Sequence, residues 1–174
     1  MPISLVQSES VNLADNFAFT GTVTGAGGGK TLQMVRAALT ARIAGSVTAG
    51  TYIDTGLTAS ITPSSSSSKI LIFTQIGMNA NVATYHYSKT VRSIGGGSYA
   101  VPTGSNPYGQ CVEYKAGSEW TSLNAAFIDE PATTSAITYK VQYTTHNSGT
   151  WNYGWNGTGG ADNMNALILV EIGP

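Results

Sequence analysis

The segment that comes nearest to a chemical motif is residues 25–31, GAGGGKT, which ends in the Gly-Lys-Thr of phosphate-binding loops. Such a loop needs four residues between its first glycine and the Gly-Lys pair, and it wraps phosphates at the start of a helix. Here Gly25 leaves three residues before Gly29, and Thr24 stands where the glycine is needed. We interpret this segment as a glycine-rich hinge, with no nucleotide bound.

Histidines, serines and acidic residues form no catalytic or metal-binding pattern. His86 and His146 are far apart in the sequence, and neither has a second ligand at the spacing of metal sites. No serine lies in a nucleophile setting such as G-x-S-x-G. Asp129 and Glu130 form the only adjacent acidic pair, and Pro131 follows them, so we expect a turn with solvated charges. The sequence predicts no catalytic residue, no metal, no cofactor and no enzyme, and it predicts that His86 is solvated or at a subunit interface.

Three aromatic residues, Trp151, Tyr153 and Trp155, alternate along one segment, so an extended backbone would place them on one side. Their neighbours are asparagine and glycine, and flat aromatic faces beside amides are typical of a saccharide-binding surface. The alternative is that these side chains fill the core or a trimer interface, where each would bury ~150–250 Å². Both interpretations remain open from the sequence.

Composition excludes two classes of partner. The chain has 174 residues with a formal net charge of −1, and 10% of them are charged, against roughly 25% in an ordinary domain. It therefore lacks the basic surface that binds nucleic acid or an anionic membrane. The sequence starts Met1-Pro2-Ile3-Ser4, without the features of a signal peptide. So few charges protect a free monomer poorly, and we expect an obligate assembly.

The elements that would position these residues are mostly strands. Residues 136–144 alternate polar and apolar side chains, as a half-buried strand does. Residues 69–76 and 165–172 are nearly continuous apolar runs, which predict strands buried on both faces. Residues 31–44 fit helical spacing as well as alternation, and we favour a strand. Further strands are expected at residues 51–62, 84–92, 108–115 and 122–129, separated by serine, glycine and proline turns typical of a sandwich or barrel.

Two regions follow from this pattern. Residues 1–31 have too little apolar surface to fold alone, and we interpret them as an N-terminal arm and a hinge, with a short strand around Phe17, Phe19 and Val23. Residues 32–174 form one β-sandwich domain, since a chain of this length can bury a core.

Two blocks of the sequence resemble a known family. Residues 52–76, YIDTGLTASITPSSSSSKILIFTQI, and 127–146, FIDEPATTSAITYKVQYTTH, are similar to blocks in the C-terminal domains of phage tail-fibre and capsid-decoration proteins, common among phages of cyanobacteria and aquatic bacteria. Residues 167–172 fit the closing strand of such domains, and residues 11–27 are similar to a segment that precedes them. The resemblance implies an all-β fold: a single TNF/C1q-like jelly-roll sandwich that is trimeric, with a short extended N-terminal arm. It implies no catalytic residue.

The resemblance also implies a place on a virion surface. Only about thirty residues precede the sandwich, too few for a fibre stalk, so we expect a homotrimeric decoration or cement protein on the capsid exterior that stabilises the shell. Phe17, Phe19 and Val23 would contact the major capsid protein by adding to its strand edges. The alternative is a short tail-fibre or appendage protein, held by a tail adaptor or fibre stalk, that binds the host receptor. In either role the outer loops could contact a host-surface saccharide. A secreted lectin-like trimer is disfavoured by the missing signal peptide.

Overall fold

Strands make up all the regular structure in the described part of the computed structural model, which covers residues 29–174 except 40–42, 104, 107–108, 118–119 and 154–164. Within it no helix is long and apolar enough to cross a membrane. The strands are β1 (Thr31–Ala38), β2 (Ile43–Val47), β3 (Ile53–Ile61), β4 (Lys69–Ala80), β5 (Thr84–Ile94), β6 (Cys111–Lys115), β7 (Trp120–Asp129), β8 (Ile137–Thr145), β9 (Gly149–Tyr153) and β10 (Ala166–Ile172).

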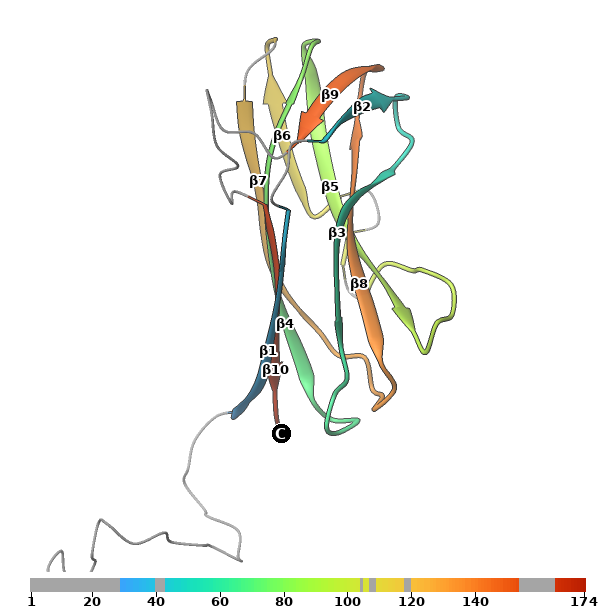
Figure 1. The fold of residues 1–174 in the computed structure, drawn as a ribbon, viewed down its shortest axis with the longest axis vertical. Helices are drawn as coiled ribbons and strands as arrows, with labels where there is room; N and C mark the ends of the chain where they lie inside the picture. The colour runs from blue at the N-terminus through green and yellow to red at the C-terminus, as the bar shows by residue number, and fades with distance from the viewer. Residues whose placement is uncertain (1–28, 40–42, 104, 107–108, 118–119, 154–164) are drawn as a thin grey trace, which may run out of the picture.

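The strands form two antiparallel sheets that face each other (Figure 1). The first sheet has the order β1-β10-β4-β9-β2, with β7 on the other side of β4, and the second has the order β3-β8-β5-β6. If the short strands β2 and β9 are left aside, the first four strands pair with the last four in reverse order: β1 with β10, β3 with β8, β4 with β7 and β5 with β6. This is the pairing of one long hairpin rolled into a jelly roll. The predicted all-β jelly-roll sandwich is confirmed.

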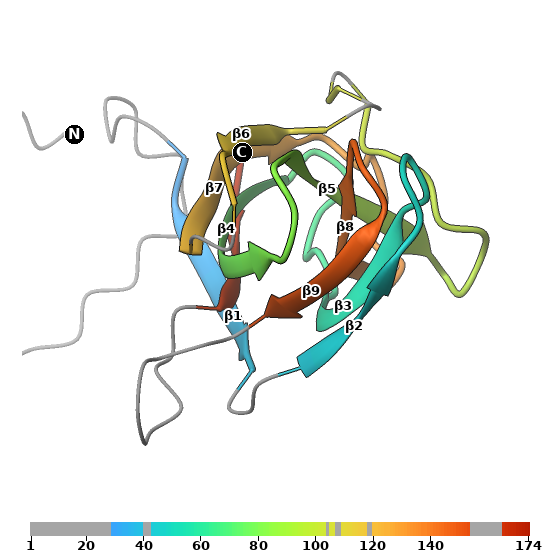
Figure 2. The same ribbon diagram turned by 90° about the horizontal axis from the view of Figure 1, so that it is seen from above.

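The core lies between the two sheets and follows from alternation along each strand. Ile70 and Ile72 of β4 and Leu167 and Leu169 of β10 point inward from the first sheet and are fully buried. The second sheet contributes aromatic and aliphatic side chains such as Tyr139. Seen from above, the sheets form two walls, with β6 and β7 close together on one side and β2 and β9 crossing the other (Figure 2).

Most of the predicted strands are present, with two short additions. Residues 31–38 of the ambiguous segment form β1, as favoured, because their pairing with β10 stabilises the extended backbone. The pairing of β2 with β9 adds two short strands that the sequence pattern does not predict. Gly29 lies against the end of β10, where a Cβ would overlap Ile172 and the carbonyl oxygen of Gly173. This glycine therefore permits close packing, and Thr31 at the end of the predicted hinge begins β1, while residues 25–28 lie outside the described residues.

A buried ionic group links the two sheets and corrects one prediction. Asp129, expected in a solvated turn, is fully buried at the end of β7. Its carboxylate accepts hydrogen bonds from Arg92 of β5 and, at 2.6 Å, from the hydroxyl of Tyr139 of β8. Glu130 remains at the surface, where it pairs with Lys69 at 2.7 Å. The prediction was wrong for Asp129 because partners distant in the sequence compensate its burial.

Candidate functional site

The outer face of the first sheet is apolar across four neighbouring strands. In β10 and in residues 69–75 of β4 every second side chain points away from the core, and in the single chain these outer side chains are only partly covered. Phe73 is 41% exposed and Ile128 is 51% exposed. The pairing of the strands aligns the outer side chains in two rows, which we call the outer apolar face: Met34, Val170, Leu71 and Ile128, and then Arg36, Ile168, Phe73 and Ala126.

The exposure of this face differs from the burial that the sequence predicts for its strands. The continuous apolar runs predict strands buried on both faces, yet the single chain buries only one. A contiguous exposed apolar surface of this kind marks an interaction site more often than a solvated face. Arg36, at the β1 end of the second row, is the one charged member of the face, and Lys69 lies beside the face at the start of β4. The outer apolar face is therefore the surface of the first sheet best suited to contact another protein.

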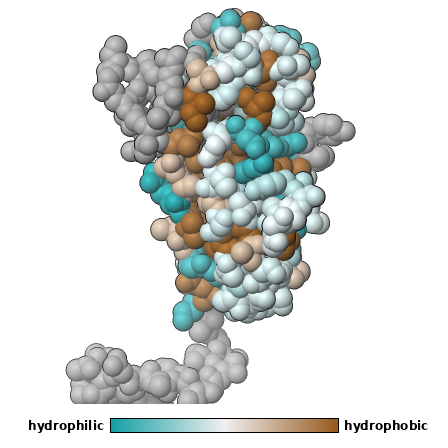
Figure 3. Space-filling view, turned by 45° about the vertical axis from the view of Figure 1, so that its right-hand side comes forward, coloured by the Kyte–Doolittle hydropathy of each residue, from teal (hydrophilic) through white to brown (hydrophobic). Residues whose placement is uncertain are grey.

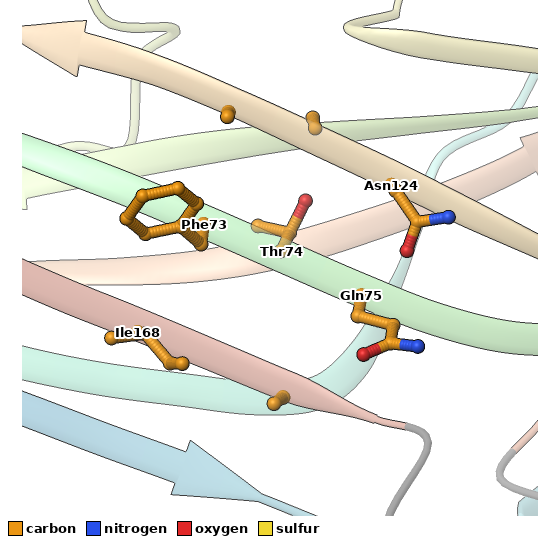
Figure 4. A pocket seen from close by; sticks show the side chains of 8 residues that line it. Phe73, Thr74, Gln75, Asn124 and Ile168 are labelled. Atoms are coloured by element: carbon orange, nitrogen blue, oxygen red, sulfur yellow. The ribbon is translucent and has the colours of Figure 1, made fainter.

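A shallow hollow of about 420 Å³ lies on the outer apolar face. Figure 4 shows Phe73 and Ile168 at one end of it and Gln75 and Asn124 at the other. The hollow exists because its remaining outer positions are small, including Ala126. A depression with an apolar end and an amide end can receive a protruding side chain of another subunit.

The predicted aromatic group is divided by the structure. Trp151 of β9 is 5% exposed and belongs to the core, where its ring centroid lies 5.7 Å from that of Tyr143. Tyr153 ends β9 through backbone pairing with Met78 and Ile43, and its side chain lies outside the described residues. Trp155 also lies outside them. Packing, one of the two interpretations, accounts for Trp151, and the saccharide interpretation stays a prediction for the other two.

The arm residues Phe17, Phe19 and Val23 lie outside the described residues, so contact with a capsid protein stays a prediction. The described part of the chain contains no group of three or more His, Cys, Asp or Glu that could hold a metal ion. Asp54, on the outer side of β3, contacts Lys140 at 2.6 Å and Gln142 at 2.7 Å. The expectation of no metal, cofactor or catalytic residue likewise stays a prediction.

His86 corrects a second prediction, because it is neither solvated nor at an outer surface. It points into the sandwich and is fully buried, and its Nδ1 lies 2.9 Å from the hydroxyl of Tyr143. The two rings stack with an interplanar angle of 25°. Burial lowers the pKa of His86 to about 4, so this histidine is neutral at pH 7.

The tyrosines on the opposite side of β5 are the surface residues that sequence reasoning missed. Because His86 points inward, Tyr85 and Tyr87 point outward from the second sheet, beside Tyr114 of β6. The ring centroids of Tyr85 and Tyr114 are 4.9 Å apart. Alternation along residues 84–92 predicts two faces, and the polar character of the His86 side wrongly predicts that this side is the outer one. Aromatic residues on both paired strands were the signal that could have identified the outer side.

Comparisons with known proteins assign no family. No family model and no curated protein matches the sequence. Solved structures to which the chain is similar include infectious bursal disease virus of the Gx strain (TM-score 0.40, 10% identity, 91% of this chain and 42% of that chain) and of the Gt strain (0.41, 7%, 97% and 46%). A third is the VP2 subviral particle of the same virus (0.38, 10%, 80% and 40%). This chain thus spans less than half the length of those chains, and at TM-scores below 0.5 the likeness carries no argument about function.

Proposed function

We propose that this chain is a structural protein of a phage virion, a trimeric decoration or cement protein on the exterior of the capsid. The observation that carries the proposal is the outer apolar face, which extends over β1, β10, β4 and β7. An exposed sheet face of this kind is stabilised when a second copy covers it, and closed symmetry limits the assembly to a defined number of subunits. The trimer itself is what the sequence resemblance implies.

The two sequence blocks that carry the resemblance each form a strand–loop–strand unit of the sandwich. The first block comprises β3, the serine-rich loop and residues 69–76 of β4, and the second comprises the end of β7, a turn and β8. Glu171 of β10 is buried and accepts hydrogen bonds from the backbone N–H and the hydroxyl of Ser64, both at 2.7 Å. The serine-rich loop thus covers a carboxylate at the end of the sandwich, and its serines have a structural role.

A cement role suits the distribution of charge and apolar surface. A decoration protein is held by its neighbours on the particle, so it does not need the surface charge that keeps a free monomer soluble. The proposed contact with the major capsid protein through Phe17, Phe19 and Val23 rests on the sequence alone. The alternative is a short tail-fibre or appendage protein with a receptor-binding function, and it would use the same trimer.

Three measurements test the proposal. Sedimentation equilibrium of the full chain at micromolar concentration should give three times the monomer mass of 18.0 kDa. A stable monomer would overturn the assembly role. Antibody labelling of virions, or a density map of the particle, should place copies over the capsid. Copies confined to the tail would overturn the cement role in favour of the tail-fibre alternative, and absence from the particle would overturn both. A chain without residues 1–29 should remain trimeric but lose capsid binding if the arm makes the contact.

A further inference from the structure

A second hollow lies on the opposite sheet, at the end where β8 leaves the sandwich. Its volume is about 450 Å³, within the ~300–1,000 Å³ range of ligand pockets. Tyr52 and Tyr87 line it together with Thr144 and His146, and the turn at Ala49 and Gly50 forms its rim. The position of the turn is fixed, since Gly50 has a φ of 73° and donates its N–H to the carbonyl of Thr145 at 3.0 Å.

Aromatic side chains surround the hollow and continue beyond it. Tyr85 and Tyr114 are half exposed, and the ring of His146 lies 6.3 Å from that of Tyr85. The ammonium of Lys89 lies 3.7 Å from the centre of the Tyr52 ring, which restrains that ring at the edge of the hollow. The face of the molecule in Figure 3 is mostly weakly polar, with separate apolar and hydrophilic patches.

The hydroxyl of Thr144 is the second, independent observation. Its neighbours Tyr143 and Thr145 point into the core, so Thr144 points outward and lines the hollow. Thr144 is 3% exposed, and its Oγ1 has no hydrogen-bond partner among the described residues. A buried hydroxyl without a partner is unfavourable, and a ligand that brings a hydroxyl group into the hollow would relieve it.

We infer that this hollow binds a neutral saccharide, with one pyranose ring against Tyr52 and Tyr87 and a sugar hydroxyl on Thr144. A pyranose ring has an apolar C–H face that fits aromatic rings, and hydroxyls at its edge that need partners such as Thr144 and His146. No Lys, Arg, Asp or Glu is among the described residues that line the hollow, and the ammonium of Lys89 at its edge lies over the Tyr52 ring, so the lining favours a neutral sugar. The site is complete within one chain and lies on the sheet opposite the outer apolar face, so it is independent of the proposed assembly.

The test uses the full-length protein and ligand-observed saturation-transfer NMR. The probes are methyl β-glucopyranoside, methyl β-galactopyranoside, methyl α-mannopyranoside and N-acetylglucosamine, each titrated to millimolar concentration, with N-acetylneuraminic acid as the anionic comparison. At least one neutral probe should give a saturable signal. Thr144→Val keeps the shape of the side chain and should weaken that binding about fivefold, the equivalent of one neutral hydrogen bond, while the melting temperature stays the same or rises. Tyr52→Ala should abolish binding.

The matched control is Tyr99→Ala. Tyr99 is an exposed tyrosine that also carries a lysine over its ring, since Lys140 lies 3.9 Å from its centre, but it does not line the hollow. This variant should bind like the wild type. The proposal is overturned if no neutral probe binds, if only the anionic sugar binds, or if Thr144→Val and Tyr52→Ala bind like Tyr99→Ala. A trimer that binds no sugar would leave the assembly role intact, and a monomer that binds sugar would leave this inference intact.

Discussion

The hydroxyl of Tyr139 donates a 2.6 Å hydrogen bond to the carboxylate of Asp129, which joins β8 of one sheet to β7 of the other across the core. Arg92 pairs with the same carboxylate, so three strands meet at one buried charge. Such a group costs free energy to bury, but removing one partner costs more, because it leaves the others unpaired.

Asp129→Ala should therefore lower the free energy of unfolding by about 3–5 kcal/mol, measured by urea denaturation. The neighbouring Glu130→Ala is the control, because its ion pair with Lys69 is exposed and should contribute less than about 1 kcal/mol. Equal effects of the two variants would contradict the assignment of Asp129 as the residue that links the sheets.

His86 should make the protein less stable as the pH falls from about 6.5 to 4. Burial lowers its pKa from 6.5 to about 4, with Lys115 contributing, so the unfolded chain binds a proton at a higher pH than the folded one. Stability from this group is complete above pH 6.5, and about 3 kcal/mol is lost by pH 4. Urea unfolding between pH 7 and 4.5 checks this. His86→Phe should flatten that dependence and His146→Gln should not; a slope unchanged by His86→Phe would refute the assignment.

Glu171 should affect the stability of the protein at lower pH than His86 does. Burial alone would raise its pKa, but hydrogen bonds from Gln33 and Ser64 outweigh burial and lower it to about 2. The contribution of Glu171 to the free energy of unfolding is therefore present above pH 4.5 and lost as the pH falls towards 2. Glu171→Gln at pH 7 should cost about 2 kcal/mol and speed hydrogen exchange at the Ser64 amide. Glu113→Gln, at the sheet edge, should leave that exchange rate unchanged, and slow exchange in Glu171→Gln would contradict the role given to this carboxylate.

Ile128→Lys should abolish self-association and leave the fold intact. Ile128 lies on the outer apolar face and is half exposed in the single chain, so a lysine fits the monomer but would be a buried, unpaired charge in an assembly. Sedimentation velocity and circular dichroism measure the two effects. Thr58→Lys, on the exposed side of the other sheet, is the control and should still assemble. A trimer in both variants would exclude this face as the interface.

Trp151 and Trp155 should behave differently. Trp151→Ala removes a core side chain and should cost about 3–5 kcal/mol. If Trp155 contacts saccharide, as the sequence predicts, Trp155→Ala should lose binding on a glycan array without a lower melting temperature. A large drop in melting temperature would instead assign Trp155 to packing.

The sequence was sufficient for the strands and the fold class, because alternation and turn residues report local backbone preference. The continuous apolar runs in β4 and β10 predicted strands buried on both faces, and this was wrong for the single chain, which leaves one of those faces uncovered. The burial of individual polar residues could not be predicted from the sequence, because it depends on partners that are distant along the chain. Asp129 is buried with Arg92 as its partner, and His86 is buried with Tyr143. Neither contact can be predicted from the neighbouring sequence.

The hollow at Tyr52 was beyond sequence reasoning for a related reason. Its lining comes from the turn before β3, from β5 and from the end of β8, which adjoin only after the sheet has formed. The orphaned hydroxyl of Thr144 is also invisible in a sequence, where one threonine in an alternating strand resembles any other.

The pairing of the first strand with the last brings both ends of the described domain to the same end of the sandwich. The N–H of Gly173 bonds the carbonyl of Lys30 at 2.8 Å, so the chain enters and leaves the sandwich at one pole (Figure 1). The strand directions place Tyr52 and His146 at the other pole. A partner bound at the pole of Gly29 would therefore leave Tyr52 and His146 accessible at the opposite pole. A fluorophore joined after Pro174 would mark the pole where the chain leaves the sandwich, and Tyr52 and His146 at the opposite pole would remain unobstructed.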